Sequence, residues 1–311
     1  MNYLGAAELR HALPPRRARD AIARAFAEIA NGSLEGPVRS SFDIAEGASL
    51  LMPAASREHL GLKVLHLRAQ NPARDLPAVI GDFLLYDRGT GELLAVLDGV
   101  ELTGIRTAAL AGHASALLAP APTEVGAILG AGFQGYYQAL ALCEAVPVRL
   151  LRVWNRTRAR AEQLAARLRE ELQGVAIEVS DSPRHAVEGA QAATLATAAA
   201  GPLLRATDVQ APIHLNAMGA YRPDMAELAP DLLSRATQVV VDDLSAALAE
   251  AGDILQAAAA GVIRLDGIQT LAQARRRRSG ITVFKSVGAA VFDLAVAEAA
   301  LEAQGQSGQR R

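Results

Sequence analysis

A glycine-rich segment at residues 125–135 constrains the fold more than any other feature of this 311-residue sequence. The apolar run 125–130 leads into the pattern G-x-G-x-x-G, formed by Gly130, Gly132 and Gly135, and an apolar helical stretch follows. Gly130 permits a tight turn, Gly132 lets a pyrophosphate approach the backbone, and Gly135 allows the helix to pack closely on the strand. Unpaired N–H groups at the helix start attract the anion. The segment therefore predicts a dinucleotide site, which also includes the intervening Ala131, Phe133 and Gln134.

The residues after this loop alternate between short apolar runs and amphipathic stretches, as βαβ units do. Helices are expected at 133–143 and 158–172. Strands are expected at 125–130, 150–155, 175–180, 192–197, 213–218, 239–243 and 281–285. This context favours a nucleotide-binding loop over a glycine-rich turn without a ligand. The predicted fold class is α/β, with a Rossmann-type doubly wound sheet.

The chain before the glycine-rich loop has a different pattern. An opening helix is expected over about residues 3–31, where apolar side chains recur at helical spacing up to Asn31-Gly32. Residues 38–102 then carry short apolar runs separated by turn signals, which is typical of a sheet. The sequence thus predicts a second, sheet-rich domain.

The boundary between these domains is marked by prolines. An alanine-rich helix is expected at 107–118, and Pro120-Ala121-Pro122 follows it. We therefore predict a first domain over 1–118 and a Rossmann domain over 119–288. A last helical stretch, 289–301, is expected to return to the first domain, whereas residues 305–311 are expected to be disordered.

Charge and composition exclude several classes of protein. The formal net charge of −2 argues against a nucleic-acid-binding surface, and the run Arg275–Arg278 is more typical of a solvated segment than of a phosphate site. Apolar runs are too short to span a bilayer. The N-terminus has no export pattern, so a cytoplasmic location is expected. The single cysteine, Cys143, is expected in the core.

Metal and nucleophile chemistry find little support in the sequence. The six histidines form no close pair with a third ligand at a familiar spacing, so no metal site is predicted. His214, inside an apolar strand, is expected to be a hydrogen-bonded core residue. No nucleophile-elbow motif is present.

The residues after the second expected Rossmann strand bear on cofactor choice. An acidic side chain at this position would bind the ribose 2′-hydroxyl of NAD. This sequence has Asn155, Arg156, Thr157 and Arg158 instead. Arginine can hold a 2′-phosphate by charge-assisted hydrogen bonds, although these arginines could also be solvated residues at a helix start. The pattern favours NADPH over NADH.

Several segments together resemble the ornithine cyclodeaminase and μ-crystallin family over nearly the whole chain. The segments are Pro37-Val38-Arg39, Met52-Pro53, Gly61-Leu62-Lys63, Asn71, Thr90-Gly91-Glu92, Leu102 to Ala109, Gly130 to Gln134, Asn216 to Gly219, Asp242-Asp243, Glu250 to Asp253, Phe284 to Gly288, and Asp293. The resemblance implies a homodimer whose first domain supplies the dimer contact and the substrate pocket.

The resemblance also implies roles for individual residues. Arg39 and Arg106 would clamp the carboxylate of a small α-imino or α-amino acid, and Lys63 would lie near its nitrogen. Arginine's planar fork suits a carboxylate. The same resemblance places Met52 and Asp293 in the substrate site. It adds to the cofactor site Thr107, Thr197, Met218, Gly219, Val287 and Gly288.

One departure from the family pattern concerns the reaction. Cyclodeaminases of this family carry an aspartate where this sequence has Tyr221, although Asp224 lies nearby. We therefore expect reduction of the C=N bond of a cyclic imino acid such as pyrroline- or piperideine-2-carboxylate, with Lys63 as the proton donor. The alternatives are an alanine- or arginine-type amino-acid dehydrogenase, an ornithine or lysine cyclodeaminase, and a non-catalytic NADPH-binding protein.

Overall fold

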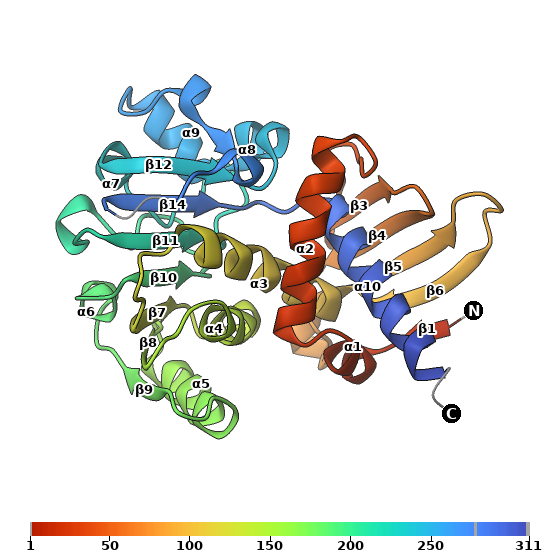
Figure 1. Cartoon of the computed structure of the whole chain (residues 1–311), viewed down its shortest axis with the longest axis horizontal. Coiled ribbons are helices and arrows are strands. Elements are labelled where there is room, and N and C mark those ends of the chain that lie inside the picture. Colours follow the sequence, from red (N-terminus) through yellow and green to blue (C-terminus); the bar gives the residue numbers. More distant parts are fainter. Residues whose placement is uncertain (1, 277–278, 309–311) are drawn as a thin grey trace. The chain divides into compact units, whose positions relative to one another are not determined.

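A computed structural model describes residues 2–276 and 279–308 of the chain (Figure 1). The chain divides into two compact units: residues 1–106 with 289–311 form the first, and residues 107–288 form the second. The first division falls inside helix α3 (Gly99–Leu118), earlier than the prolines at 120 and 122 where a boundary was expected. Pro120 follows the end of the helix closely, but the residues of α3 from Thr107 onward already pack within the second unit.

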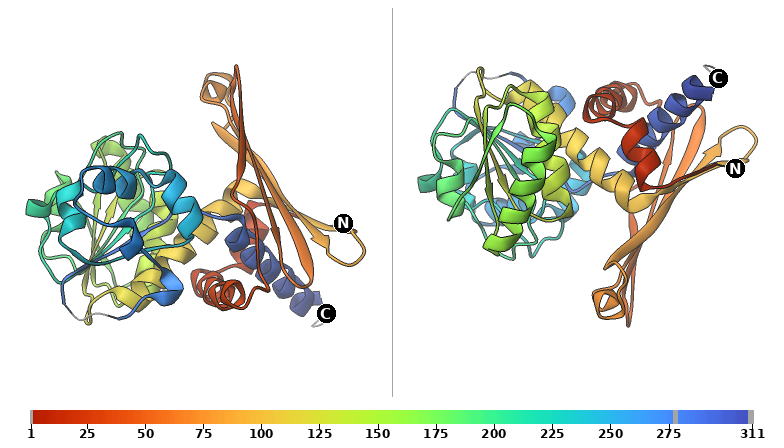
Figure 2. Two further views of the ribbon diagram at one scale, coloured as in Figure 1. Left: turned by 90° about the horizontal axis from the view of Figure 1, so that it is seen from above. Right: turned by 90° about the horizontal axis from the view of Figure 1, so that it is seen from below.

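The first unit is built on one six-stranded sheet in the order β1-β6-β5-β4-β3-β2. Its strands are β1 (Asn2–Leu4), β2 (Ser40–Ile44), β3 (Gly47–Ala55), β4 (His59–Leu67), β5 (Val79–Asp87) and β6 (Leu93–Asp98), and its helices are α1 (Ala6–Ala12), α2 (Pro15–Ala30), α10 (Ala290–Gly308) and the 3-10 turn η1 (Asn71–Arg74). Neighbouring strands are antiparallel, except that β1 is parallel to β6. Helices α2 and α10 lie on the same side of this sheet (Figure 2).

Two expectations for this unit were wrong in detail. The opening segment is a strand and two helices rather than one helix, because Pro14 and Pro15 follow Leu13 and lack the N–H groups that would continue α1. At the other end, α10 continues to Gly308, beyond the expected end at residue 301, so residues 305–308 are helical and not disordered. The expectation of disorder for residues 309–311 lies outside the described residues.

The second unit is an eight-stranded parallel sheet in the order β13-β12-β14-β11-β10-β7-β8-β9. Its strands are β7 (Val125–Leu129), β8 (Leu150–Trp154), β9 (Ala176–Val179), β10 (Ala192–Leu195), β11 (Ile213–Ala217), β12 (Ala236–Val241), β13 (Gln269–Thr270) and β14 (Ile281–Lys285). Its helices are the rest of α3, α4 (Phe133–Ala145), α5 (Arg158–Glu171), α6 (Pro183–Val187), α7 (Pro230–Ser234), α8 (Leu244–Glu250) and α9 (Gly252–Ala259), with 3-10 turns η2 (Ala206–Asp208), η3 (Leu265–Gly267) and η4 (Leu271–Gln273).

This topology confirms the doubly wound Rossmann-type sheet. The order along the sheet reverses between β7 and β10, and helices cover both faces (Figure 2). Every strand predicted in this half is present. Strand β13 was not predicted because its two residues carry no apolar run. In such a sheet, ligands bind beyond the carboxyl ends of the strands, next to the reversal.

Polar side chains inside this sheet are hydrogen-bonded to one another. His214 is fully buried, with Nδ1 2.9 Å from Thr282 Oγ1 and Nε2 3.0 Å from Asn216 Oδ1. Burial lowers the pKa of His214 to about 4, so the ring is neutral at pH 7. The prediction of a hydrogen-bonded core histidine is confirmed.

Cys143 is partly buried on α4, and burial raises its thiol pKa to about 12.

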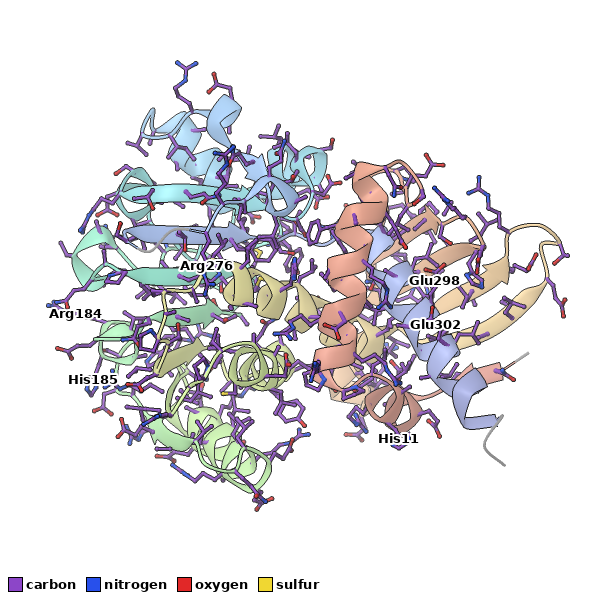
Figure 3. All side chains as sticks on the ribbon, in the orientation of Figure 1. His11, Arg184, His185, Arg276, Glu298 and Glu302 are labelled. Atoms are coloured by element: carbon purple, nitrogen blue, oxygen red, sulfur yellow. The ribbon has the colours of Figure 1, made fainter. Side chains whose placement is uncertain are left out.

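The structure also bears on membrane spans and metal sites, which the sequence did not favour. In the described part of the chain, no helix combines the length and apolarity needed to cross a bilayer. Within residues 2–276 and 279–308, no three His, Cys, Asp or Glu side chains are grouped so that they could hold a metal ion. His11 on α1 and His185 on α6, for example, are exposed (Figure 3).

Candidate active site

A buried lysine in the first unit forms the centre of the candidate substrate site. Lys63 lies in the middle of β4, on the side covered by α10, and is fully buried. Its Nζ donates a hydrogen bond to Asp293 Oδ1 of α10 at 2.8 Å. Arg106, at the end of this unit, donates from Nε to the same oxygen at 3.1 Å. Three residues that are distant in the sequence therefore meet at one carboxylate.

The charges around Lys63 are unbalanced. Burial lowers the pKa of Lys63 from 10.5 to about 8, Asp293 opposes this shift, and Arg106 and Arg39 add to it. Lys63 and Arg106 are both buried, and both donate to the single carboxylate of Asp293. A buried excess of positive charge is costly unless an anion joins it, so the cluster suits a ligand with a carboxylate group.

One oxygen atom of the cluster is available to accept a further hydrogen bond. Asp293 Oδ2 is buried and has no hydrogen-bond partner among the described residues. Buried polar atoms are normally paired, and an acceptor left open beside a lysine can bind the N–H of a ligand. Met52 on β3 is the direct cross-strand neighbour of Lys63 and supplies apolar surface beside it. The structure therefore brings together Lys63, Arg106, Asp293 and Met52, with Arg39 near enough to act on the Lys63 pKa.

The glycine-rich loop of the second unit has the geometry that a pyrophosphate needs. Gly130 has φ +116°, and a Cβ there would lie 2.4 Å from the Ala196 carbonyl oxygen. A Cβ on Gly135 would lie 1.9 Å from the Gly130 oxygen, so only glycine lets α4 approach β7 this closely. A Cβ on Gly132 would meet nothing within 4 Å. Open space therefore faces the backbone N–H groups at the start of α4, and the loop fits a dinucleotide.

The residues after β8 separate into two kinds. Asn155 Oδ1 accepts a hydrogen bond from Ala131 N at 3.1 Å, and its Nδ2 donates to the Thr157 carbonyl at 3.0 Å, which fixes the glycine-rich loop to the end of β8. Arg158 pairs with Glu162 at 2.9 Å and with Asp181. Arg156 is exposed. Of the two arginines considered for a 2′-phosphate, Arg158 is thus already shared between two carboxylates.

The other predicted cofactor residues lie mainly at the carboxyl ends of the strands. Thr197 follows β10, Met218 and Gly219 follow β11, and Val287 and Gly288 follow β14. Thr107 lies instead on helix α3, where it is buried. The parallel topology places the strand-end residues along the sheet edge where nucleotides bind.

Sequence reasoning missed a second buried charge cluster in the second unit. Lys285 Nζ, at the end of β14, lies 2.9 Å from Asp253 Oδ2, and both side chains are about 1% exposed. Glu227, also fully buried, accepts hydrogen bonds from Thr197 N and Oγ1 and from Gly219 N. In the sequence, a lysine at the end of the mostly apolar strand 281–285 was the one sign of a buried charge here. Glu227 has no comparable pattern around it.

The region of the absent cyclodeaminase aspartate is exposed. Tyr221 is 38% exposed. Asp224 forms two contacts of 3.1 Å with Arg222, and both side chains are largely exposed. An exposed carboxylate already paired with an arginine is typical of a turn, so the structure gives no support to Asp224 as a replacement acid.

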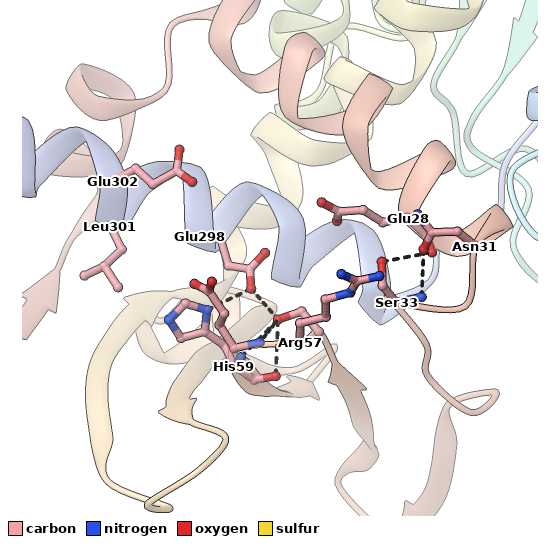
Figure 4. A pocket seen from close by; sticks show the side chains of 10 residues that line it. Glu28, Asn31, Ser33, Arg57, His59, Glu298, Leu301 and Glu302 are labelled. Atoms are coloured by element: carbon pink, nitrogen blue, oxygen red, sulfur yellow. Dashed lines mark hydrogen bonds and ion pairs between the residues drawn. The ribbon is translucent and has the colours of Figure 1, made fainter.

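A hollow of about 510 Å³ lies elsewhere in the first unit (Figure 4). In it, His59 Nδ1 is 2.8 Å from Glu298 Oε1, and Ser56 Oγ donates to the same oxygen at 2.5 Å. Glu28 also lines it, and burial together with Glu298 raises the pKa of that carboxyl. Ser56, His59 and Glu298 are thus already paired with one another, and none of the predicted site residues lines the hollow.

Comparison with known proteins relates the chain to enzymes that act on imino acids. Residues 6–307 match the model of the ornithine cyclodeaminase/mu-crystallin family. The chain is 35% identical over 290 residues to ketimine reductase mu-crystallin of Mus musculus, covering 92% of this chain and 90% of that protein. It is 33% identical over 274 residues to Delta(1)-pyrroline-2-carboxylate reductase of Bacillus cereus, covering 84% of each. The structure of Thermococcus litoralis Delta(1)-pyrroline-2-carboxylate reductase in complex with NADH and L-proline matches with a TM-score of 0.93 and 30% identity, over 99% of this chain and 98% of that one.

Proposed function

The chain belongs to the ornithine cyclodeaminase/mu-crystallin family, and we propose that it reduces the C=N bond of a small cyclic α-imino acid to the L-amino acid with a nicotinamide cofactor. Pyrroline-2-carboxylate and piperideine-2-carboxylate are the substrates that we would test first. The relatives from Mus musculus and Bacillus cereus are named as a ketimine reductase and a pyrroline-2-carboxylate reductase. The observation that carries the proposal for this chain is the buried Lys63–Asp293–Arg106 cluster.

Lys63 and the arginines would divide the work on the substrate. The substrate carboxylate would offset the positive charge that Lys63 and Arg106 carry in excess of Asp293, and Arg39 would add a further contact to it. Lys63, with a pKa near 8, is mostly protonated at pH 7 and can still release its proton to the imine nitrogen. A protonated imine is more electrophilic at its α-carbon. Asp293 would keep the lysine protonated and oriented.

The second unit would hold the cofactor. The backbone of Gly130, Gly132 and the start of α4 would bind the pyrophosphate. The bound nicotinamide supplies the hydride for the α-carbon. Asn155 would hold the loop in place by its bond to Ala131 N. The protein's own side chains and backbone would bind the two ligands, orient them and, at Lys63, transfer a proton.

NADPH is the cofactor that we propose in preference to NADH. No carboxylate follows β8 at the position where one would bind the ribose 2′-hydroxyl, and Arg156 is exposed there. Because Arg158 is paired with Glu162 and Asp181, we assign the larger share of 2′-phosphate binding to Arg156.

We also propose a homodimer formed through the first unit. Side chains alternate between the faces of a strand, so residues of β4 next to Lys63 point away from α10. By the strand register, this open face carries Phe42, Ile44, Leu60 and Ile80, each between 39% and 50% exposed. Phe42, Ile44 and Ile80 lie toward one end of this face and Leu60 toward the other, and apolar side chains exposed over one sheet face favour an interface. A second copy of this chain is the proposed partner, and the molar mass from light scattering tests it.

The function is tested by following the absorbance of NADPH and NADH at 340 nm with a panel of cyclic and acyclic imino acids. We expect turnover with a cyclic imino acid and chiral analysis that shows only the L-amino acid. A protein that binds NADPH but turns over no imino acid in the panel would instead be a non-catalytic binder. Turnover confined to acyclic 2-oxo acids with ammonia would favour an amino-acid dehydrogenase.

A further inference from the structure

Glu227 connects two of the loops at the carboxyl edge of the Rossmann-type sheet. Its Oε1 accepts hydrogen bonds from Thr197 N at 2.7 Å and from Thr197 Oγ1 at 2.9 Å. Its Oε2 accepts a hydrogen bond from Gly219 N at 2.7 Å. Thr197 follows β10 and Gly219 follows β11, which are adjacent strands. One buried carboxylate therefore ties together the ends of two parallel strands.

The two loops are held too closely for side chains to separate them. A Cβ added to Gly219 would lie 2.0 Å from the Thr197 carbonyl oxygen and 2.5 Å from Glu227 Oε1. On the other side, a Cβ on Gly130 would lie 3.0 Å from Thr197 Cγ2. Three loops thus form one contiguous backbone surface: the glycine-rich loop, the loop after β10 and the loop after β11. Glu227 binds the last two of these loops.

Glu227 is itself fixed by a second layer of charge. Asp253 Oδ1 accepts hydrogen bonds from the backbone N–H groups of Glu227 and Leu228, at 2.6 and 2.8 Å. The other oxygen of Asp253 lies 2.9 Å from Lys285 Nζ. Burial raises the pKa of Glu227, and Lys285 together with the N–H groups of Thr197 and Gly219 opposes this shift by favouring the carboxylate. The network contains no exposed member, so its function is exerted through the backbone that it holds.

We propose that Glu227 is the residue that positions the nicotinamide half of the cofactor, and that Asp253 and Lys285 support it. A dinucleotide site of this fold consists of two mononucleotide halves on either side of the reversal in strand order. The adenosine half belongs to β7 and β8, where Gly130, Gly132 and Asn155 lie. The loops that Glu227 joins belong to β10 and β11, on the other side. The inference rests on the proposed nicotinamide cofactor.

The test compares binding of the whole cofactor with binding of its adenosine half. Glutamine in Glu227→Gln must turn N–H groups toward the N–H of either Thr197 or Gly219, so one strand-end contact is lost. We expect NADPH to bind at least about tenfold more weakly, because a charge-assisted hydrogen bond is lost. Binding of adenosine 2′,5′-bisphosphate should change less than about twofold, since the bonds on its side are kept. If wild type prefers NADH, the probes are NADH and ADP.

Two further variants separate positioning from general damage. Ile177→Ala removes buried side-chain atoms from β9, the edge strand that is separated from β10 by β7 and β8, and serves as a control for lower stability. It should not change the ratio of the two dissociation constants. Asp253→Asn leaves Thr197 and Gly219 unchanged but weakens the hydrogen bonds that hold the backbone of Glu227 and Leu228, so it should weaken NADPH binding selectively but to a smaller extent, even if Glu227→Gln fails to fold.

Equal weakening of both probes, or no weakening of NADPH binding, would overturn the inference. These measurements do not depend on turnover. If no imino acid is reduced, the proposed function fails while the binding ratio still decides the role of Glu227. Conversely, normal imine reduction with an unchanged binding ratio refutes only the positioning role.

Discussion

Removing the negative charge of Asp293 should shift the pH dependence of imine reduction toward lower pH. Asp293→Asn keeps the shape of the side chain but deletes the charge 2.8 Å from Lys63 Nζ. At an effective dielectric constant of about 20, Coulomb's law bounds this pair at about 6 kcal/mol. Charge-assisted hydrogen bonds contribute about 1.5–3 kcal/mol in practice, which corresponds to about one to two pH units.

The sign follows from the groups around Lys63. Asp293 raises the pKa of Lys63, whereas burial, Arg106 and Arg39 lower it to about 8. Without Asp293 the lysine loses its proton at a lower pH. A reaction that needs protonated Lys63 falls off near pH 8 in wild type. In Asp293→Asn it should fall off between about pH 6 and 7, by the shift of one to two units.

The assay is kcat/KM for the imino acid between pH 5.5 and about 10, measured at saturating NADPH. Glu298→Gln is the matched control, because it makes the same change on the same helix but contacts His59 and Ser56 rather than Lys63. The substrate also titrates, but its contribution is the same in all three proteins. An alkaline limb at the same pH in wild type and Asp293→Asn would refute the assignment of Lys63 as the acid.

Three more predictions concern individual residues. Arg106→Leu should lower kcat/KM for the imino acid by at least about a hundredfold, whereas the dissociation constant of NADPH should be unchanged in a fluorescence titration. Arg156→Ala should reduce the NADPH over NADH preference in kcat/KM by about tenfold or more, and Arg158→Ala by less, because Arg158 is already paired. Since Tyr221 replaces the cyclodeaminase aspartate, ornithine or lysine with catalytic NADP+ should release little ammonia in a coupled assay; efficient proline formation from ornithine would contradict this.

Much of the fold could be predicted because its patterns are local. The spacing of Gly130, Gly132 and Gly135 has mechanical causes within a single turn, and each predicted strand of the parallel sheet is a short apolar run. The failures have local causes as well. The prolines at 14 and 15 interrupt an otherwise helical pattern of apolar residues. Helix α10 continues past residue 301 into a segment of glycine and polar residues, 304–308, whose composition did not predict a helix.

The candidate site was harder to predict because its residues meet through tertiary structure. No spacing in the sequence indicates that Lys63 and Asp293 share a hydrogen bond, and only the family resemblance placed both in one site. The resemblance also marked Asp253 and Lys285 without giving either a role. Glu227 had neither signal. A buried acid whose partners are backbone N–H groups of distant loops leaves no recognisable pattern of side chains in the sequence.

The two buried lysines of this chain should behave differently when each is changed to methionine. Lys285 faces the carboxylates of Asp253 and Glu227. Its removal leaves two buried acids without a cation, which typically costs about 3–5 kcal/mol. Lys63→Met leaves Asp293 paired with Arg106. Because the pKa of Lys63 is lowered from 10.5 to about 8, its burial in charged form costs roughly 3 kcal/mol below pH 8.

Lys63→Met should therefore abolish imine reduction at pH 7 while the melting temperature stays the same or rises, whereas Lys285→Met should lower the melting temperature. The sign can be checked with pH. Between about pH 8 and 10.5 the unfolded chain binds the Lys63 proton and the folded chain does not, so wild type gains stability relative to Lys63→Met as pH rises. Thermal unfolding at pH 7 and 9.5 measures both effects. A Lys63→Met protein that is as destabilised at pH 7 as Lys285→Met would show that Lys63 is held for structure, and the distinction between a lysine that shares its carboxylate with an arginine and a lysine beside two buried acids would fail.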